Sequence, residues 1–372
     1  MGYYCLALVI GSFGAPGSHL NWLVYTVPPA ACGAWAAFGG KLGLRTFARS
    51  SIALALIATA CAFSVMASGV NAYSLRDAYF WMSPFLFSIF ITRIEYKHLQ
   101  WLLWACIVCL FGAYSSGQYE PPGFNLLASQ SLLETVYTFP VGLLLIAFFL
   151  AGRGEKSNLL NIAICVLFMM ISFKRISLAG IVIACALYYI IFIHINKKIY
   201  LKYFYVSIFA ALAIFSINSV NIISYVNENF LNIFRGSPEE LLLGRASLYF
   251  PVKSFAAANS GEISQYFGFG IGKIANSFGE LWSTARTRQL HNDYLRILFE
   301  TGVFGLFCVM AAYGLLIRRN AKTLAALVYM LLLFISDNTL SYPFFTVSLI
   351  VVIRWFETKQ RETEACRVRA RL

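Results

Sequence analysis

Long apolar runs follow one another along most of this chain, and they constrain its fold more than any other feature. A lipid bilayer offers no hydrogen-bond partner to free backbone groups, so such runs cross it as helices. Twelve runs have membrane-spanning character, near residues 1–14, 20–39, 50–69, 77–93, 99–116, 136–151, 158–173, 177–195, 203–220, 291–317, 322–337 and 341–356. The sequence therefore predicts an all-α polytopic membrane protein with about twelve transmembrane helices.

Composition supports a single membrane domain over residues 1–372. Hydrophobic residues make up 59% of the chain and charged residues only 12%, whereas a soluble domain usually has about 25% charged residues. No segment is polar and long enough to form a separate globule. The net charge of +13 does not by itself indicate a nucleic-acid partner, because it reflects where Lys and Arg lie relative to the spans.

The basic residues fall mostly on one side of the predicted membrane. If Met1 is cytoplasmic, the inner loops, Arg354 and a basic tail at 357–372 together hold nineteen Lys and Arg residues, and the short outer loops hold only Arg76, Lys174 and Arg175. Cytoplasmic loops of membrane proteins are enriched in such residues. We therefore expect both termini in the cytoplasm.

Residues 221–290 form the one long polar segment, and the charge pattern predicts that it lies outside. Residues 237–240 read SPEE, which combines a capping Ser, a Pro at the first helical position and two acids in the first turn. We expect a helix on the membrane surface there, interrupted near Pro251. Residues 268–273 read GFGIGK and lack the pattern of a nucleotide-binding loop, which leaves a tight turn or a close backbone approach to a ligand.

Several charged residues are predicted to lie at the outer boundary of the membrane, where an ionisable side chain is costly and therefore a functional candidate. They are Lys174, Arg175, Arg245 and Asp337. The structural alternatives are cations that reach lipid head groups for the first two, and a partner of nearby acids for Arg245. Asp337 is a possible orienting partner for a histidine or a cation.

The stretch HNDYLRILFETGVFG, residues 291–305, predicts a helix with His291 at its outer mouth. In a continuous helix, His291, Leu295, Leu298 and Gly302 share a face, and Gly302 lies roughly 16 Å deeper. Gly302 and Gly305 then form a notch of small residues that allows another helix to approach closely.

Arg296 and Glu300 lie four residues apart on that predicted helix. Opposite charges at this spacing neutralise one another in a medium of low dielectric constant. We expect a structural pair, with the alternative that Arg296 extends outward and joins a site near His291.

The order His291-Asn292, nine residues, Gly302, two residues, Gly305 resembles the signature H[NSQ]x9Gxx[GTY] of the bacterial O-antigen ligase family. The domain of that family is shared with O-antigen polymerases and some protein O-oligosaccharyltransferases. The resemblance extends to the long periplasmic loop before the motif, an Arg on the loop and a basic outer turn. It is strongest over residues 160–310. The outer turn here reads FKRIS, with Lys174 beside Arg175, where relatives more often have Ser-Arg.

The resemblance implies a membrane glycosyltransferase of the GT-C type in the bacterial inner membrane. Its donor would be a glycan linked to undecaprenyl diphosphate and its acceptor a sugar hydroxyl of lipid A–core, with no metal or other cofactor. Departure of a diphosphate calls for neutralising charge, and an acceptor hydroxyl calls for a base that titrates near neutrality.

These requirements assign expected roles to the candidate residues. We expect His291 to act as the base or to orient the acceptor, and Arg175 and Arg245 to clamp the diphosphate. We expect further substrate contacts, more weakly, from Lys174, Arg296, Asn292 and Asp337.

Three other functions remain open at this point. A polymerase that joins donor repeat units would use the same donor chemistry with a different acceptor. A transporter of lipid-linked sugars would need charged or broken helices near the membrane midplane and internal repeats. A structural scaffold would leave His291 and the cations at the membrane boundary unexplained.

Overall fold

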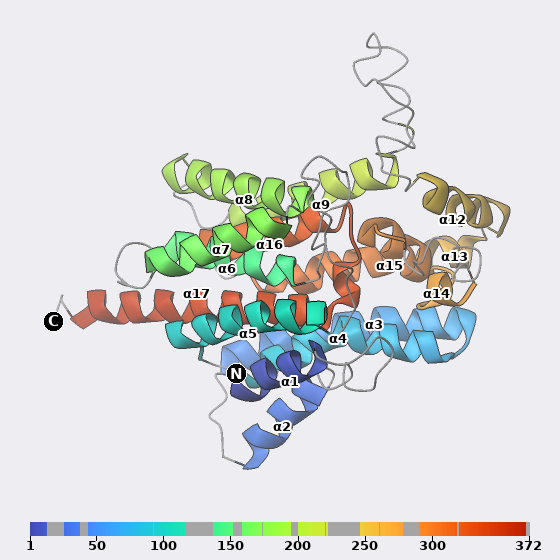
Figure 1. Cartoon of the computed structure of the whole chain (residues 1–372). Helices are drawn as coiled ribbons and strands as arrows, with labels where there is room; N and C mark the ends of the chain where they lie inside the picture. The colour runs from blue at the N-terminus through green and yellow to red at the C-terminus, as the bar shows by residue number, and fades with distance from the viewer. Residues whose placement is uncertain are drawn as a thin grey trace, which may run out of the picture.

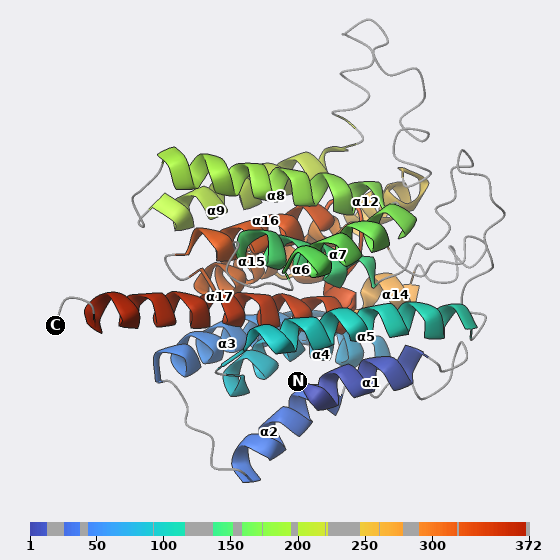
Figure 2. The same ribbon diagram turned by 60° about the vertical axis from the view of Figure 1, so that its left-hand side comes forward.

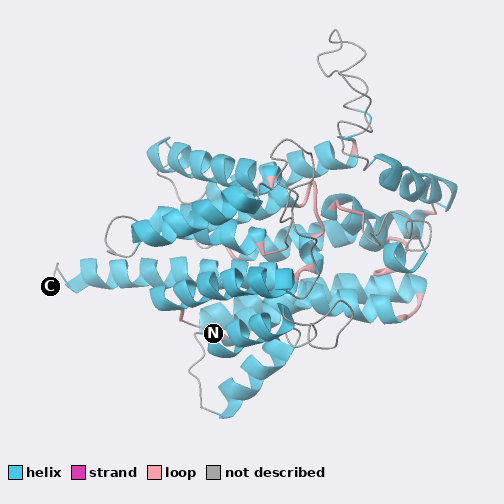
Figure 3. Ribbon diagram, viewed as in Figure 1, coloured by secondary structure: helices cyan, strands magenta, loops and turns pink. Residues whose placement is uncertain are grey.

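A computed structural model gives the fold of the 372-residue chain. The structure describes residues 1–12, 26–37, 44–91, 93–115, 137–151, 158–172, 174–194, 200–219, 221, 246–259, 261–277, 290–317 and 320–369. Within these ranges it contains fifteen α-helices and no strand (Figure 3). The expected all-α class is therefore confirmed for the described residues.

Each of the twelve predicted runs contains a helix. These are α1 (Gly2–Ser12), α2 (Val27–Ala37), α3 (Leu44–Ser68), α4 (Ala72–Phe90), α5 (Tyr96–Ser115), α6 (Thr138–Ala151), α7 (Asn158–Ser172), α8 (Arg175–His194), α9 (Tyr200–Ile217), α15 (Asp293–Leu315), α16 (Ala321–Leu333) and α17 (Pro343–Arg369). Three of them, α3, α9 and α15, are long and apolar enough to cross a membrane. Helices α6, α7 and α16 are also apolar but shorter, as is the part of α8 over Arg175–Ile191. The number of twelve spans stays a prediction.

The long polar segment also contributes helices, namely α12 (Ala246–Asn259), α13 (Glu262–Phe267) and α14 (Lys273–Ser277). The predicted helix start at 237–240 lies outside the described residues. The expected interruption near Pro251 is wrong, because α12 continues through this residue. The φ of proline, about −65°, is a helical value, so α12 accommodates Pro251 and loses the one backbone hydrogen bond that its missing N–H would have donated.

The long helices lie side by side, and α12, α13 and α14 gather at one end of them, beside α3 and α15 (Figures 1 and 2). The main contacts join α15 to α3, α16 to α8, α3 to α4 and α6 to α7. Helices α6 and α16 are buried along nearly their whole length. A helix that is apolar all round belongs in the interior, so these two form the centre of the bundle.

Polar contacts mark the two ends of the bundle. At one end, buried Arg354 of α17 donates hydrogen bonds to Glu357 (2.7 Å) and Ser50 (2.8 Å) and to the Ser88 carbonyl (3.0 Å). The other end holds α12 to α14 and the turn before α17, which contains the short 3₁₀ helix η3 (Thr339–Ser341). Helix α17 runs on to Arg369, so most of the predicted basic tail continues this helix.

Helix α15 is broken at Gly302, where φ is +67° and ψ is −170°. A break leaves the preceding carbonyls without their intrahelical donors. The carbonyls of Phe299 and Glu300 instead accept hydrogen bonds from the amides of Phe269 (2.8 Å) and Gly270 (3.0 Å). The prediction of a continuous helix with His291 and Gly302 on one face is therefore wrong. His291 lies before the helix, and Gly302 interrupts it.

The sequence GFGIG, which we call the glycine turn (residues 268–272), fills this break. A Cβ atom on Gly268 would lie 2.4 Å from the Glu300 backbone, and one on Gly272 would lie 2.6 Å from the Ser74 amide nitrogen. Both glycines have positive φ. The turn therefore sits between α15 and the start of α4, and the close approach made by Gly268 and Gly272 is to protein backbone.

We expect Gly302→Ala to destabilise the protein by at least ~1–3 kcal/mol, the cost of a residue held in an unfavourable backbone region. An added Cβ would also lie 2.3 Å from the Tyr266 carbonyl oxygen. Thermal unfolding in detergent should show a lower midpoint. The control is Gly33→Ala in α2, where no atom lies within 4 Å of the new Cβ and the midpoint should be unchanged or higher. Equal midpoints for both variants would contradict the role given to the break.

Candidate functional site

Lys174, His291 and Asp337 converge at the end of the bundle that holds α12 to α14. The Lys174 ammonium lies 2.8 Å from Oδ2 of Asp337, and Nδ1 of His291 lies 3.9 Å from Oδ1 of the same carboxylate. These three residues precede α8, precede α15 and follow α16, respectively. The sequence expectation that Asp337 lies beside a histidine or a cation therefore agrees with the geometry, since it lies beside both.

Asp337 is buried and well supplied with hydrogen-bond donors. Its Oδ1 accepts hydrogen bonds from the Asn338 amide (2.9 Å) and the Tyr342 hydroxyl (3.1 Å). Burial of the carboxyl raises its pKa, but the charges of Lys174 and His291 oppose this and hold the pKa of Asp337 well below its usual range. Asp337 is thus a carboxylate at neutral pH.

The backbone of His291 is held in a conformation that presents its side chain at the surface of the cluster. Its φ is +52°, which is uncommon for a residue other than glycine. Its carbonyl accepts a hydrogen bond from the Tyr249 hydroxyl at 3.4 Å. The His291 side chain is 24% exposed, against 3% for Asp337, so an imidazole oriented by a buried carboxylate can still meet a ligand.

Asn292, an expected substrate contact, is buried and caps α15. Its Oδ1 accepts hydrogen bonds from the Leu295 amide (3.0 Å) and the Ser216 hydroxyl (2.9 Å). An Asn at this position satisfies a free amide of the first turn. The structure thus gives Asn292 the task of fixing where α15 begins, directly after His291.

The two cations of the FKRIS turn have different surroundings. Lys174 is largely buried, pairs with Asp337 and lies 4.2 Å from the centre of the Phe139 ring. Arg175, the first residue of α8, is exposed, and no hydrogen bond or ion pair joins its side chain to the described part of the chain. Arg175 is therefore the cation of this turn that is free to bind an anion. Arg245 lies outside the described residues.

Arg296 lies inside the protein in a network of charges. Its guanidinium contacts Oδ2 of Asp77 at 2.5 Å and Oε2 of Glu300 at 3.1 Å, and it donates a third hydrogen bond to Ser341. The expected pair of Arg296 with Glu300 is therefore present. Sequence reasoning missed Asp77, although an acid beside the start of an apolar run is itself a signal of a buried partner.

The two motif glycines contact different parts of the protein. Gly302 lies against the Tyr266 backbone of α13, and Gly305 lies against the Thr301 side chain of its own helix. The close approach at Gly302 is therefore made to the polar segment between α9 and α15. The helix that approaches Gly302 is thus α13, and the expected notch of Gly302 and Gly305 stays a prediction.

A cavity of about 360 Å³ lies between α12, α13 and α15, and its wall includes Leu295, four residues after His291. Apolar side chains form most of its wall, among them Val252, Ala256, Leu298 and Val303. Lys253 also lines it and donates a hydrogen bond to the Ile217 carbonyl at 2.7 Å. The size lies in the range of small-ligand sites, and the lining suits a hydrocarbon chain. No group of three His, Cys, Asp or Glu side chains in the described ranges could hold a metal ion.

Comparison with known families gives one match. Residues 160–310 match the family model described as O-antigen ligase. The match confirms the resemblance drawn from the motif between His291 and Gly305, and it covers less than half of the chain. Asp77 and Asp337 lie outside it. No curated protein matches the chain in sequence.

We expect Asp337→Asn to destabilise the protein by about 3 kcal/mol, because it leaves the buried Lys174 cation without its counter-ion. The folded-state pKa of Asp337 is below its unfolded value of about 3.9, so the stabilisation is present above that pH and is lost as pH falls through the folded pKa. Thermal midpoints of the two proteins should differ at pH 8 and pH 5, and the difference should begin to shrink only as the pH falls below about 4.

The matched control for this prediction is Glu262→Gln, which neutralises an exposed acid at the start of α13. Its effect should stay within about 0.5 kcal/mol. An Asp337→Asn protein as stable as this control at pH 8 would show that the ion pair contributes no stability.

Proposed function

We propose, from the premise that residues 160–310 belong to the O-antigen ligase family, that this protein is an O-antigen ligase. It transfers a glycan from undecaprenyl diphosphate to a sugar hydroxyl of lipid A–core. Members of the family are membrane glycosyltransferase-like enzymes. In this proposal the protein lies in the bacterial inner membrane, with both termini cytoplasmic and the site on the periplasmic side.

The observation that supports this function best is the His291, Asp337 and Lys174 cluster with exposed Arg175 next to it. The cluster provides a buried carboxylate, a partly exposed imidazole and a free cation at one end of the helix bundle. A glycosyl transfer from a lipid diphosphate needs a base for the acceptor and positive charge for the leaving group. The cluster supplies the base in His291, and Arg175, adjacent to Lys174 in the chain, supplies the positive charge.

In the proposed reaction the acceptor hydroxyl gives its proton to His291 as its oxygen attacks the anomeric carbon of the donor. The new glycosidic C–O bond forms while the bond from that carbon to the diphosphate oxygen breaks. Asp337, on the Nδ1 side of the imidazole, orients the ring and stabilises its protonated form. Nε2 is then the nitrogen directed at the acceptor.

The diphosphate leaves with an additional negative charge, and fixed cations lower the free energy of that transition state. We assign this role to Arg175 and Arg245. Lys174 and Arg296 are weaker candidates, because the structure engages each of them with carboxylates. Lys174 instead keeps Asp337 ionised.

The apolar cavity beside α12 supports a donor with a hydrocarbon chain. Tyr249 and Val252 lie one turn apart on α12. The first bonds to the His291 carbonyl, and the second lines the cavity. A polyprenyl chain in this cavity would bring its diphosphate close to His291.

A transfer assay with purified protein tests the proposed function. Lipid-diphosphate-linked glycan is supplied with or without lipid A–core, and wild type is compared with His291→Ala and Arg245→Ala. We expect glycan-capped lipid A–core from the wild type only, with His291→Ala slower by about 10²–10⁴-fold, the usual contribution of a general base.

The other products of this assay decide between the remaining functions. Longer lipid-linked glycans formed without lipid A–core would identify a polymerase. Movement of the donor across a bilayer without either product would identify a transporter and contradict the enzyme proposal.

We further expect that Arg175→Ala and Ala256→Trp each raise the KM for the lipid-linked donor, the first by removing a cation and the second by filling the cavity. Loss of a charge-assisted hydrogen bond costs about 1.5–3 kcal/mol, or roughly 10- to 100-fold in binding. Steady-state kinetics with varied donor measure both effects.

Each variant has a control in which the same type of change is made at an exposed position away from the site. Lys202→Ala removes an exposed cation of α9 at the opposite end of the bundle, and Ala258→Trp adds the same ring to the exposed face of α12. Donor KM values equal to those of the controls would show that neither the cation nor the cavity binds the donor.

A further inference from the structure

Three charged side chains form a buried network, of which only Arg296 is a candidate, and a weaker one, for contact with the diphosphate. Asp77 and Glu300 are fully buried and Arg296 is 5% exposed. Arg296 lies between the two acids, and Asp77 also pairs with the Arg76 side chain at 2.8 Å. Removing such groups from water is costly, and buried ion pairs are retained in some proteins because they specify one conformation.

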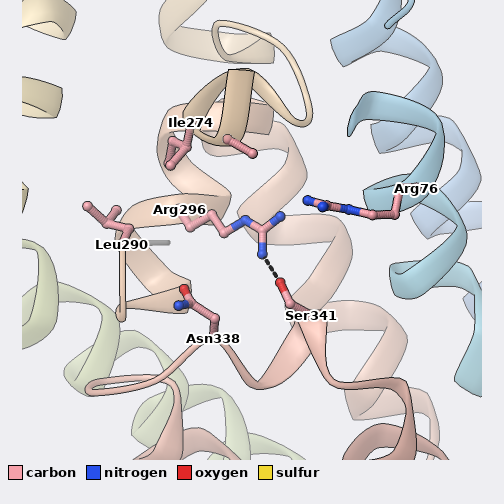
Figure 4. Close-up of a pocket in the computed structure, with 7 residues that line it drawn as sticks. Arg76, Ile274, Leu290, Arg296, Asn338 and Ser341 are labelled. Atoms are coloured by element: carbon pink, nitrogen blue, oxygen red, sulfur yellow. Dashed lines mark hydrogen bonds between the residues drawn. The ribbon is translucent and has the colours of Figure 1, made fainter. Parts of the chain in front are cut away.

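The network extends to the turn between α16 and α17. Arg296 donates a hydrogen bond to the hydroxyl of Ser341, and Ser341 is the last residue of η3 (Figure 4). Figure 4 also shows that the Arg76 side chain of α4 points toward the Arg296 guanidinium. The planar guanidinium fixes the directions of its hydrogen bonds, so the position of Ser341 depends on where Asp77 and Glu300 hold Arg296.

The first turn of α15 holds the same segment at a second point. Oδ2 of Asp293 accepts hydrogen bonds from the Thr339 hydroxyl (2.9 Å) and the Leu340 amide (3.1 Å). The amide of Asp293 donates to the Phe334 carbonyl at 2.8 Å. The turn of residues 334–342 is therefore attached to α15 along most of its length.

This turn also carries the carboxylate that faces His291. Asp337 lies in it, four residues before Ser341, and Tyr342, which donates to Asp337, directly follows Ser341. A shift of Ser341 would therefore move both Asp337 and its hydroxyl donor. The distance from Asp337 to the imidazole is 3.9 Å, so a small shift decides whether the two groups form a hydrogen bond.

We propose that Asp77 and Ser341 are positioning residues for the proposed transfer reaction, acting through Arg296 to place Asp337 against His291. The inference rests on the proposed function of His291. It assigns a task to residues of α4 and η3 that do not contact the proposed substrates. The buried ion pairs thereby act on the site without being part of it.

The first test compares two serines of the same turn. Ser341→Ala removes the bond to Arg296 and leaves all three ion pairs intact. Ser336→Ala removes a hydroxyl whose oxygen is buried and has no hydrogen-bond partner in the described structure. We expect Ser341→Ala to lower kcat by about 10-fold or more, the scale of a sub-ångström misplacement, with little change in the donor KM. Ser336→Ala should retain the wild-type kcat, and Ser341→Thr, which keeps the hydroxyl, should restore most of it.

The second test measures coupling in a double-mutant cycle of Asp77→Asn and Ser341→Ala. If Asp77 acts through Arg296 and Ser341, the effect of Ser341→Ala on kcat is smaller in the Asp77→Asn protein. Two independent stability losses would give effects that multiply. Thermal midpoints are measured in parallel, and the Ser341 comparison stands alone if Asp77→Asn does not fold.

These outcomes separate the inference from the proposed function. A wild type without transfer activity overturns the proposed function. An active wild type in which Ser341→Ala retains the kcat of Ser336→Ala overturns the positioning role, as do effects of Asp77→Asn and Ser341→Ala that multiply. A lower kcat for Ser341→Ala together with rescue by Ser341→Thr supports it.

Discussion

The contact of Arg296 with Asp77 and Glu300 is the interaction on which the arrangement of the site depends. It joins α4 to α15, and the bond from Arg296 to Ser341 extends it to the turn before α17. Glu300 joins residues 270–274 to these segments as a fourth. Its carboxylate accepts a hydrogen bond from the Ile274 amide at 3.2 Å, and its carbonyl accepts one from the Gly270 amide. In a medium of low dielectric constant, separating these charges would leave each of them unpaired at high cost.

The break in α15 gives this network its connection to the polar segment. A regular helix would have used the Phe299 and Glu300 carbonyls internally. The positive φ of Gly302 releases them, and the amides of the glycine turn take their place. The same local feature therefore shortens the straight part of the helix and attaches α13 and α14 to the bundle. Helix α13 then forms one wall of the apolar cavity between α12 and α15.

Much of this architecture could be predicted from the sequence, since apolar runs of the right length form helices wherever they are placed. Each predicted run contains one, and Asn292 caps α15 as its residue type favours. The pairing of Arg296 with Glu300 follows from helical spacing alone. The continuous helix through Gly302 was predicted wrongly, because the spacing of residues within a helix does not show whether outside donors will replace its internal hydrogen bonds.

Local pattern and composition thus determined the helical class, the positions of the helices and the set of charged residues that need an explanation. Only the tertiary structure decided which of them meet. Asp77 lies 219 positions from Arg296 along the chain, and Lys174 and Arg175 are adjacent in sequence but differ in burial and partners. The physical reason is that a charge in a helix bundle is stabilised by its neighbours in space. Those neighbours come from helices that pack together, and local sequence does not specify which helices these are.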